Sequence, residues 1–215
     1  MTEPTEPALA PEPKRPWFEP VTAILMAVAT LLSAWCSYQS SRWSGQSSGF
    51  ATQADVLQRQ AFGQYLASQQ IQSVQIEVFM EAMNAQLRGD ETTLRFYTDR
   101  FAGNLKPAYE KWLALKPFEN PAAPPHPFTP ELYVPTFHQE ITDARAEAAR
   151  LAAQSQATSM RAAGFLSNTV ILAMVLFFAG TASKFDQSRV RQYSLAFAIA
   201  LFLYAAVRVV MLHFA

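Results

Sequence analysis

Histidine is the side chain in this sequence best suited to acid–base or metal chemistry, and it occurs as His126, His138 and His213. None of the three has a second ligand or base at a suitable spacing. The nearest carboxylate, Glu140, would face a different side of a helix from His138, so a site there would need partners brought to it by folding. The chain also lacks the usual nucleophile, zinc-protease and phosphate-loop motifs. We therefore predict no catalytic residue, no metal site and no cofactor.

Arg208 is the charged side chain in the most unusual position, because it interrupts the apolar run at the end of the sequence. A guanidinium inside a membrane span costs about 3 kcal/mol on insertion scales. Arg208 lies close to the outer end of its run, so three alternatives stay open: snorkelling to the interface, pairing with a lipid phosphate, or a specific role inside the membrane. No acidic residue lies within the apolar runs, so a buried ion-pair relay lacks its second half.

A second concentration of functional groups lies in residues 34–45, which read AWCSYQSSRWSG. Trp35, Tyr38 and Arg42 are expected on one helix face, with Trp43 beside them. Aromatic side chains gather at membrane–water interfaces, and such a belt is the simplest interpretation. The alternative is a binding site for lipid headgroups or for a partner protein.

The pattern A-W-x-x-Y-Q-x-x-R-W-x-G in this segment closes a first apolar run and precedes a helix rich in glutamine and alanine. It resembles small bacterial inner-membrane proteins with three spans and no assigned function. The resemblance implies a bacterial inner membrane. It implies no activity and no functional residues.

Three apolar runs are expected to position these residues. No charged residue occurs in 20–41 or 162–183, and the last run covers 192–207 and continues past Arg208. A helix of 22 residues is roughly 33 Å long, enough to cross a hydrocarbon core of about 30 Å. Two alternatives are a buried helix of a soluble protein and, for the first run, which follows Lys14 and Arg15, a cleaved export signal.

The orientation follows from the short loop between the last two runs. It carries Lys184, Arg189 and Arg191 against Asp186, and short basic loops stay on the cytoplasmic side. We therefore expect a cytoplasmic N-terminus, a periplasmic or extracellular central segment and a C-terminus outside.

The central segment reads as a series of helices. Gly45 and Gly49 suggest a loosened helix or a joint after the first span. Asp90 suggests a helix N-cap, and Pro107 is expected to kink or split the next helix near Gly103. Residues 117–135 are rich in proline and are expected to form a strap packed on the domain, with a functional surface as the alternative.

From Thr136 the apolar positions keep a spacing of three and four that is typical of a coiled coil and runs into the second apolar run. One helix over about 136–183 is therefore predicted. Its outer half is dominated by alanine, which lets a partner helix approach closely.

The predicted fold class is an all-α membrane protein with three transmembrane helices and an extracytoplasmic antiparallel helical hairpin or bundle continuous with the spans. The predicted segments are a disordered tail at 1–16, a first span at 17–41, the extracytoplasmic domain at 42–161 with its strap at 117–135, a second span at 162–183, a cytoplasmic loop at 184–191 and a third span at 192–215.

The functional hypotheses follow from this architecture. The first is a non-enzymatic scaffold or accessory protein that acts through protein–protein contact or self-association, with the lipid bilayer and a homo-oligomer or membrane-protein partner around it. The alternatives are a ligand-sensing, channel or transporter component, and then a membrane enzyme. A formal net charge of zero gives no support for a nucleic-acid partner, and the lone Cys36 excludes an intrachain disulfide.

Overall fold

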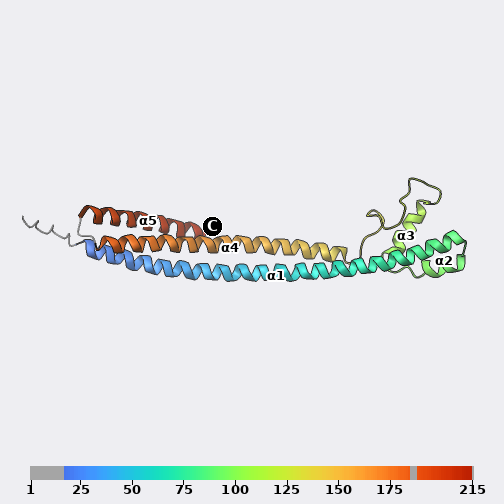
Figure 1. The fold of residues 1–215 in the computed structure, drawn as a ribbon, viewed down its shortest axis with the longest axis horizontal. Coiled ribbons are helices and arrows are strands. Elements are labelled where there is room, and N and C mark those ends of the chain that lie inside the picture. The colour runs from blue at the N-terminus through green and yellow to red at the C-terminus, as the bar shows by residue number, and fades with distance from the viewer. Residues whose placement is uncertain (1–16, 185–187, 215) are drawn as a thin grey trace, which may run out of the picture. The chain divides into compact units, whose positions relative to one another are not determined.

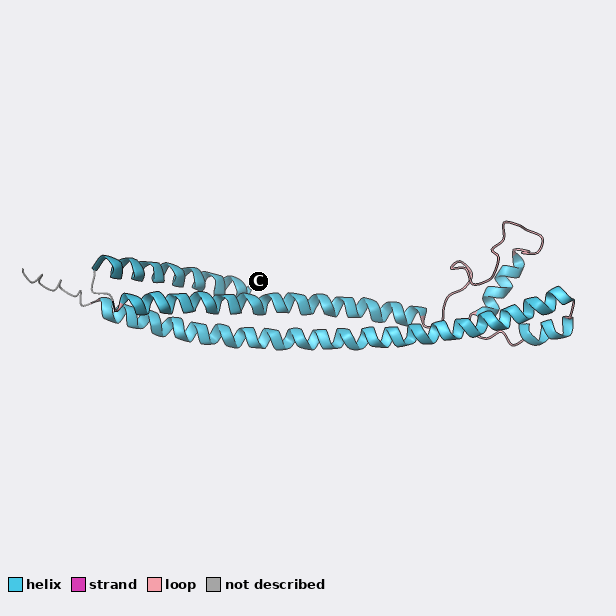
Figure 2. Cartoon of the chain, in the orientation of Figure 1, coloured by secondary structure: helices cyan, strands magenta, loops and turns pink. Residues whose placement is uncertain are grey.

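The computed structural model describes residues 17–184 and 188–214, and over those residues it is helical without strands (Figures 1 and 2). The helices are α1 (Phe18–Arg88), α2 (Glu91–Thr98), α3 (Leu105–Ala114), α4 (His138–Ala182) and α5 (Ser188–Phe214). The all-α class is therefore confirmed for the described residues. The tail predicted at 1–16 and part of the loop predicted at 184–191 lie outside them.

The chain divides into two compact units. The three-helix unit contains the described residues up to Phe50 and from Ala153 onward, and the aromatic unit contains Ala51–Ala152. Both α1 and α4 pass from one unit into the other without an end.

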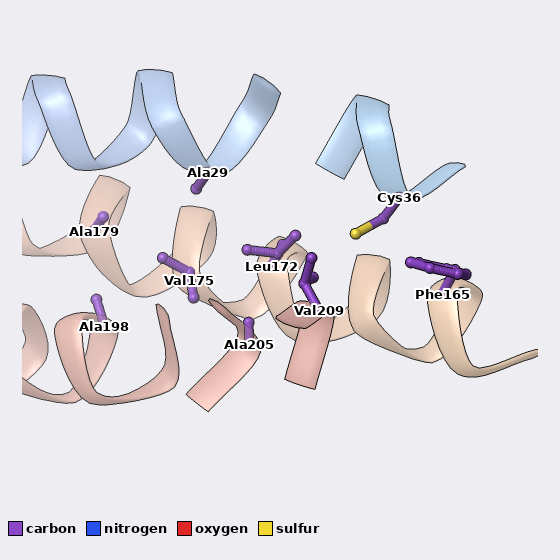
Figure 3. Close-up of a cluster of buried hydrophobic side chains, with 9 residues drawn as sticks. All are labelled: Ala29, Cys36, Phe165, Leu172, Val175, Ala179, Ala198, Ala205 and Val209. Atoms are coloured by element: carbon purple, nitrogen blue, oxygen red, sulfur yellow. The ribbon is translucent and has the colours of Figure 1, made fainter. Parts of the chain in front are cut away.

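The three-helix unit is built from the first part of α1, the last part of α4 and α5. Its core is lined mostly by small side chains (Figure 3). The buried residues are Ala29, Cys36, Phe165, Leu172, Val175, Ala179, Ala198, Ala205 and Val209. Gly164 of α4 lies directly against Leu212 of α5, because a Cβ built there would sit 2.7 Å from Leu212 Cδ2. Small residues at these positions let the helix backbones approach closely.

Hydrogen bonds fix the directions of these helices. Along α1 the residues Cys36, Ser40 and Ser47 contact Asn168, Ala162 and Ser155 of α4 in turn. Residue numbers rise along α1 as they fall along α4, so these two stretches run in opposite directions. Asn168 and Ser167 likewise contact Ala205 and Arg208, so α5 runs opposite to α4.

Three helices are long and apolar enough, by length and composition, to cross a membrane. They are α1, α4 and the stretch Arg189–Leu212 of α5. The apolar runs read from the sequence fall on these three helices.

The aromatic unit packs the last turns of α1 against α3 and the segment that follows it. Its core is Phe79, Ala82, Phe101, Leu105, Tyr109 and Trp112, with Phe128 and Leu132 beside it. The Phe79 ring meets the rings of Trp112 and Phe128 edge-on, with ring centres 5.6 and 5.7 Å apart. Such edge-to-face pairs add to the free energy of burial.

The helix ends follow from local chemistry, with one exception. Asp90 caps α2 by accepting from the backbone N–H of Thr93 at 3.0 Å, as predicted. The predicted split before Pro107 is also confirmed, because α2 and α3 are separated by a turn in which Gly103 has a φ of +57°. Of the two alternatives at Gly45 and Gly49, a loosened helix or a joint, the joint was wrong: α1 continues through both as helix.

The long helix predicted from Thr136 begins at His138. Phe137 adopts a φ of +62°, in the left-handed region that a phenylalanine seldom enters. This residue turns the chain from the strap into α4. The single helix predicted over 136–183 is otherwise confirmed as His138–Ala182.

The proline-rich strap packs on the helices of the aromatic unit. Trp112 Nε1 donates to the carbonyl of Pro124 at 2.7 Å, and Asn104 Nδ2 donates to that of Val134 at 2.7 Å. Tyr133 donates its hydroxyl to Gln75 Oε1 at 2.6 Å. Trp112 and Asn104 satisfy strap carbonyls that would otherwise lack these partners, and Tyr133 joins the strap to α1. The strap is therefore packed on the helices, as predicted.

Candidate functional site

Residues 34–45, which the sequence suggested as an interface belt or a binding site, lie on α1 beside the end of α5. The structure separates their side chains. Trp35 and Trp43 are half-buried against the helix packing, whereas Tyr38 and Arg42 are exposed. The four residues therefore do not form one converging site.

The two tryptophans have defined partners on α4. The Trp35 ring meets the Phe165 ring edge-on, with centres 5.7 Å apart. The guanidinium carbon of Arg161 lies 5.1 Å from the centre of the Trp43 ring, a distance at which a cation is attracted to the ring face. Both contacts hold α1 against α4.

Arg208 lies on α5, away from the aromatic pairs on α1. Its Nη2 donates to Ser167 Oγ at 3.2 Å, and its guanidinium carbon lies 5.9 Å from the centre of the Tyr204 ring. Ser167 in turn donates its hydroxyl to the Gly164 carbonyl at 2.9 Å, which leaves its oxygen lone pairs for Arg208. The sequence singled out Arg208 but gave no indication of Ser167.

Asn168 is a polar residue that the sequence reasoning missed. It is fully buried among the three helices, and its Nδ2 donates to the Ala205 carbonyl at 3.2 Å and lies 3.6 Å from Cys36 Sγ. Its Oδ1 has no hydrogen-bond partner among the described residues. One side chain thus links all three helices. An asparagine within the uncharged run 162–183 was the available signal, and attention to formal charges passed over it.

Hydroxyl groups form a second link between α1 and α4. Ser47 Oγ donates to the Ser155 carbonyl at 2.8 Å, and Ser155 Oγ donates to the Ser47 carbonyl at 2.9 Å. Ser40 Oγ donates to the Ala162 carbonyl at 3.0 Å. Short hydroxyl side chains make these bonds only where the backbones are close.

Charged residues mark two common levels in the three-helix unit. In the observed register, Arg42 of α1 lies level with Arg161 of α4, and Glu19 of α1 lies level with Lys184. At 1.5 Å per residue the two levels are roughly 34 Å apart. In the described parts of α1, α4 and α5, Arg208 is the charged residue that lies well inside these two levels.

At the Glu19 level, the guanidinium carbon of Arg191 lies 4.7 Å from the centre of the Phe18 ring. Phe18, Ala182 and Leu195 form a small buried cluster there. Arg191 of the predicted loop therefore contacts the start of α1.

The aromatic unit contains a groove of about 500 Å³ beside its core. One wall is α1, through Met80, Met83 and Leu87, and the other is the strap, through Pro117, Phe118 and Pro121. Phe79 and Trp112 also line it, and no charged residue does.

In the described parts of the chain, no three His, Cys, Asp or Glu side chains are grouped so that they could hold a metal ion. Among the histidines, the His126 ring lies 6.2 Å from the Phe128 ring centre in the strap, and His138 starts α4. The side chain of His213 lies outside the described residues.

Comparison of the chain with protein-family models, with curated proteins and with solved structures finds no match.

Proposed function

We propose that the chain is a three-span membrane protein in which α1, α4 and α5 cross the bilayer side by side. Support comes from the two charged levels, whose separation of roughly 34 Å suits a hydrocarbon core of about 30 Å. A helix in a soluble core has no reason to place charges at matching levels on its neighbours. Trp17 at one level and Trp35, Tyr38 and Trp43 near the other fit interfacial belts.

The proposed orientation places the Glu19 level at the cytoplasmic face, since Lys184, Arg189 and Arg191 belong to a short loop there. The N-terminus is then inside, and the aromatic unit lies on the periplasmic or extracellular side as an antiparallel helical hairpin continuous with the spans. The bacterial inner membrane is the membrane that the sequence resemblance implies.

A labelling experiment in intact cells tests this orientation. In a Cys36→Ala background, a cysteine at Lys184 should stay unreactive towards an impermeant maleimide, and a cysteine at Asp99 should react readily. Both positions are exposed in the structure. Ready labelling at Lys184 with protection at Asp99 would reverse the orientation.

The function that the geometry supports best is a non-enzymatic scaffold that self-associates or binds another membrane protein through its helical domain. One observation carries it. Exposed apolar side chains follow one side of α1 at helical spacing: Phe62, Leu66, Ile76, Met80 and Leu87. We call these five residues the apolar row. Exposed apolar side chains gathered on one side of a helix mark an interaction site in a soluble domain. Here they form two groups, one before and one after the exposed Gln69 and Ser73.

A second copy of the chain is the occupant we propose for the apolar row. Anchoring in one bilayer holds the row of each copy at the same height, so two copies lose less translational and rotational freedom on meeting than partners in solution do. The five side chains of the row are uncharged, and the exposed Glu77 lies beside Ile76 and Met80.

Size measurement in mild detergent tests this proposal. Phe62→Gln combined with Leu66→Gln should shift the protein from an oligomer to a monomer, because glutamine keeps the helix and removes the apolar contact. Val74→Gln is the matched control, since Val74 is equally exposed on another side of α1 and its change should leave assembly intact. A wild-type protein that runs as a lone monomer and co-purifies with no membrane protein would refute the scaffold.

The groove of the aromatic unit favours a second candidate function, ligand sensing. Its volume of about 500 Å³ lies within the usual range for small-molecule sites, and Trp112 reports on its occupancy. Titration with uncharged aromatic compounds should then change the tryptophan fluorescence of the wild type, and Met83→Glu should abolish the change. A flat titration across such compounds speaks against this candidate.

A further inference from the structure

Arg208 lies between the two charged levels, on the side of α5 that faces α4. It is level with Ser167, to which it donates a hydrogen bond at 3.2 Å. Along α4, Ser167 lies roughly 9 Å from Arg161 towards the middle of the span. The guanidinium is therefore below the level of Arg42 and Arg161, within reach of the glycerol and phosphate region of one leaflet.

The charge of Arg208 has no acidic neighbour. An arginine side chain stays protonated in proteins, and the described residues of 20–54, 148–184 and 188–214 include no Asp or Glu. Among the described residues, Ser167 accepts a hydrogen bond from the Arg208 guanidinium. Because this bond uses a single N–H, the rest of the planar fork remains for an outside anion.

The surface around the fork is apolar and points to the acyl chains of a lipid. On α4, the exposed side chains of Val170 and Met174 follow Ser167 towards the middle of the span. On α5, those of Tyr204 and Phe197 follow Arg208 in the same direction. On the other side of Arg208, the close contact of Gly164 with Leu212 closes the space between α4 and α5.

We propose that Arg208, oriented by Ser167 and flanked by Tyr204, binds the phosphate of an anionic phospholipid whose acyl chain lies along Val170, Met174 and Phe197. Charge selects the anionic class. A zwitterionic headgroup brings its own cation, and the described residues at this end of the unit include no Asp or Glu to accept it. The bound lipid neutralises the guanidinium that the spans leave without an acid. The inference rests on the membrane placement proposed above.

Native mass spectrometry of the intact protein in mild detergent, titrated with phosphatidylglycerol, tests this site. Arg208→Gln should weaken binding at least about tenfold, the loss of one or more charge-assisted hydrogen bonds. Arg208→Lys should keep part of the affinity, because an ammonium retains the charge without the fork. Arg42→Gln is the matched control, an exposed arginine at the same end of the unit, and should bind as the wild type does.

Each other outcome overturns the proposal. Equal losses in Arg208→Gln and Arg42→Gln would show diffuse attraction to basic residues. Equal binding of phosphatidylcholine would refute the anionic class. Displacement of the lipid by millimolar inorganic phosphate would make a soluble anion the occupant. A wild type that purifies without detergent would instead refute the membrane placement, which separates the two failures.

Discussion

The two units of the chain fill their interiors with different side chains. The three-helix unit buries alanines, a cysteine and a few larger aliphatic residues between its helices. The aromatic unit buries phenylalanine, tyrosine and tryptophan rings between α1, α3 and the strap. Large rings in water gain much free energy from burial. Helices in lipid gain little from it, so they depend on close backbone approach and polar links.

The hydrogen bonds made by side chains also differ between the two units. In the three-helix unit, side chains donate to carbonyls within helices, either of their own helix, as Thr30 does to Met26, or of a neighbouring helix, as Ser40 does to Ala162. In the aromatic unit, Trp112 and Asn104 donate to carbonyls of the non-helical strap. Tyr133 of the strap donates to the Gln75 side chain of α1. Non-helical backbone is tolerable in water or under such side chains, and is excluded where lipid surrounds the chain. The contrast fits the proposed membrane placement, in which lipid surrounds the three-helix unit and water surrounds the aromatic unit.

Trp112→Ala should have the largest effect and should separate the units. It removes the ring at the centre of the aromatic core and the bond to Pro124, at a cost of about 3–5 kcal/mol. Hydrogen exchange should show lost protection in α3 and the last turns of α1, with protection in α5 unchanged. Leu113→Ala, at a half-exposed neighbouring position, should change little. Equal loss of protection in both units would mean that they unfold together.

Gly164→Ala should weaken the three-helix unit by close packing alone. The new Cβ would meet Leu212, and overpacking of this kind costs about 1–3 kcal/mol. Unfolding in SDS should occur at a lower detergent fraction, and the second change Leu212→Ala should restore it. Gly180→Ala is the control, because a Cβ there comes no closer than 4.0 Å to Met26. A wild-type midpoint for Gly164→Ala would contradict the contact.

Asn168→Leu should destabilise the same unit by about 1 kcal/mol, the usual size of an interhelical polar link in a membrane. The change removes the bond to Ala205 and the contact with Cys36. Thr169→Val is matched to it, because the Thr169 hydroxyl bonds within its own helix. If both variants unfold at the same SDS fraction, Asn168 does not link the helices.

Asp90 should give the smallest effect, confined to α2. Hydrogen bonds from the side chain and backbone of Thr93 hold the pKa of Asp90 below its ordinary value. Its contribution is therefore fully present above the ordinary pKa of about 4 and is lost as the pH falls through the lowered pKa. Asp90→Asn keeps the capping oxygen and should remove this part of the pH dependence. Exchange rates in α2 measured from pH 6 to pH 3 compare the two, and parallel profiles would exclude the cap as the cause.

The architecture was predictable wherever the signal lay in a run of neighbouring residues. Uncharged runs located the three long helices, and Asp90 and Pro107 located helix ends, because these effects act within a few residues. Gly45 and Gly49 misled because a glycine weakens a helix by only about 1 kcal/mol, which packing of the flanking turns offsets.

The side-chain partners were less predictable, because they depend on register between distant helices. Asn168 meets Ala205 and Cys36, and Arg208 meets Ser167, through packing that a single sequence does not display. Likewise Trp35 turns towards Phe165 while Tyr38 remains exposed, although both were expected on one face. The spacing of residues along a helix shows which of them share a side. Which side is buried depends on where the neighbouring helix packs.

The pairing of α1 with α4 has a consequence for the synthesis of the chain. Ser47 is separated from Ser155 by 108 residues, and Cys36 from Asn168 by 132. A ribosome adds about 5–20 residues per second, so roughly 5–20 s pass between the two halves of the serine pair. In the proposed membrane placement, the first apolar helix stands in the bilayer during that interval without α4 as its neighbour.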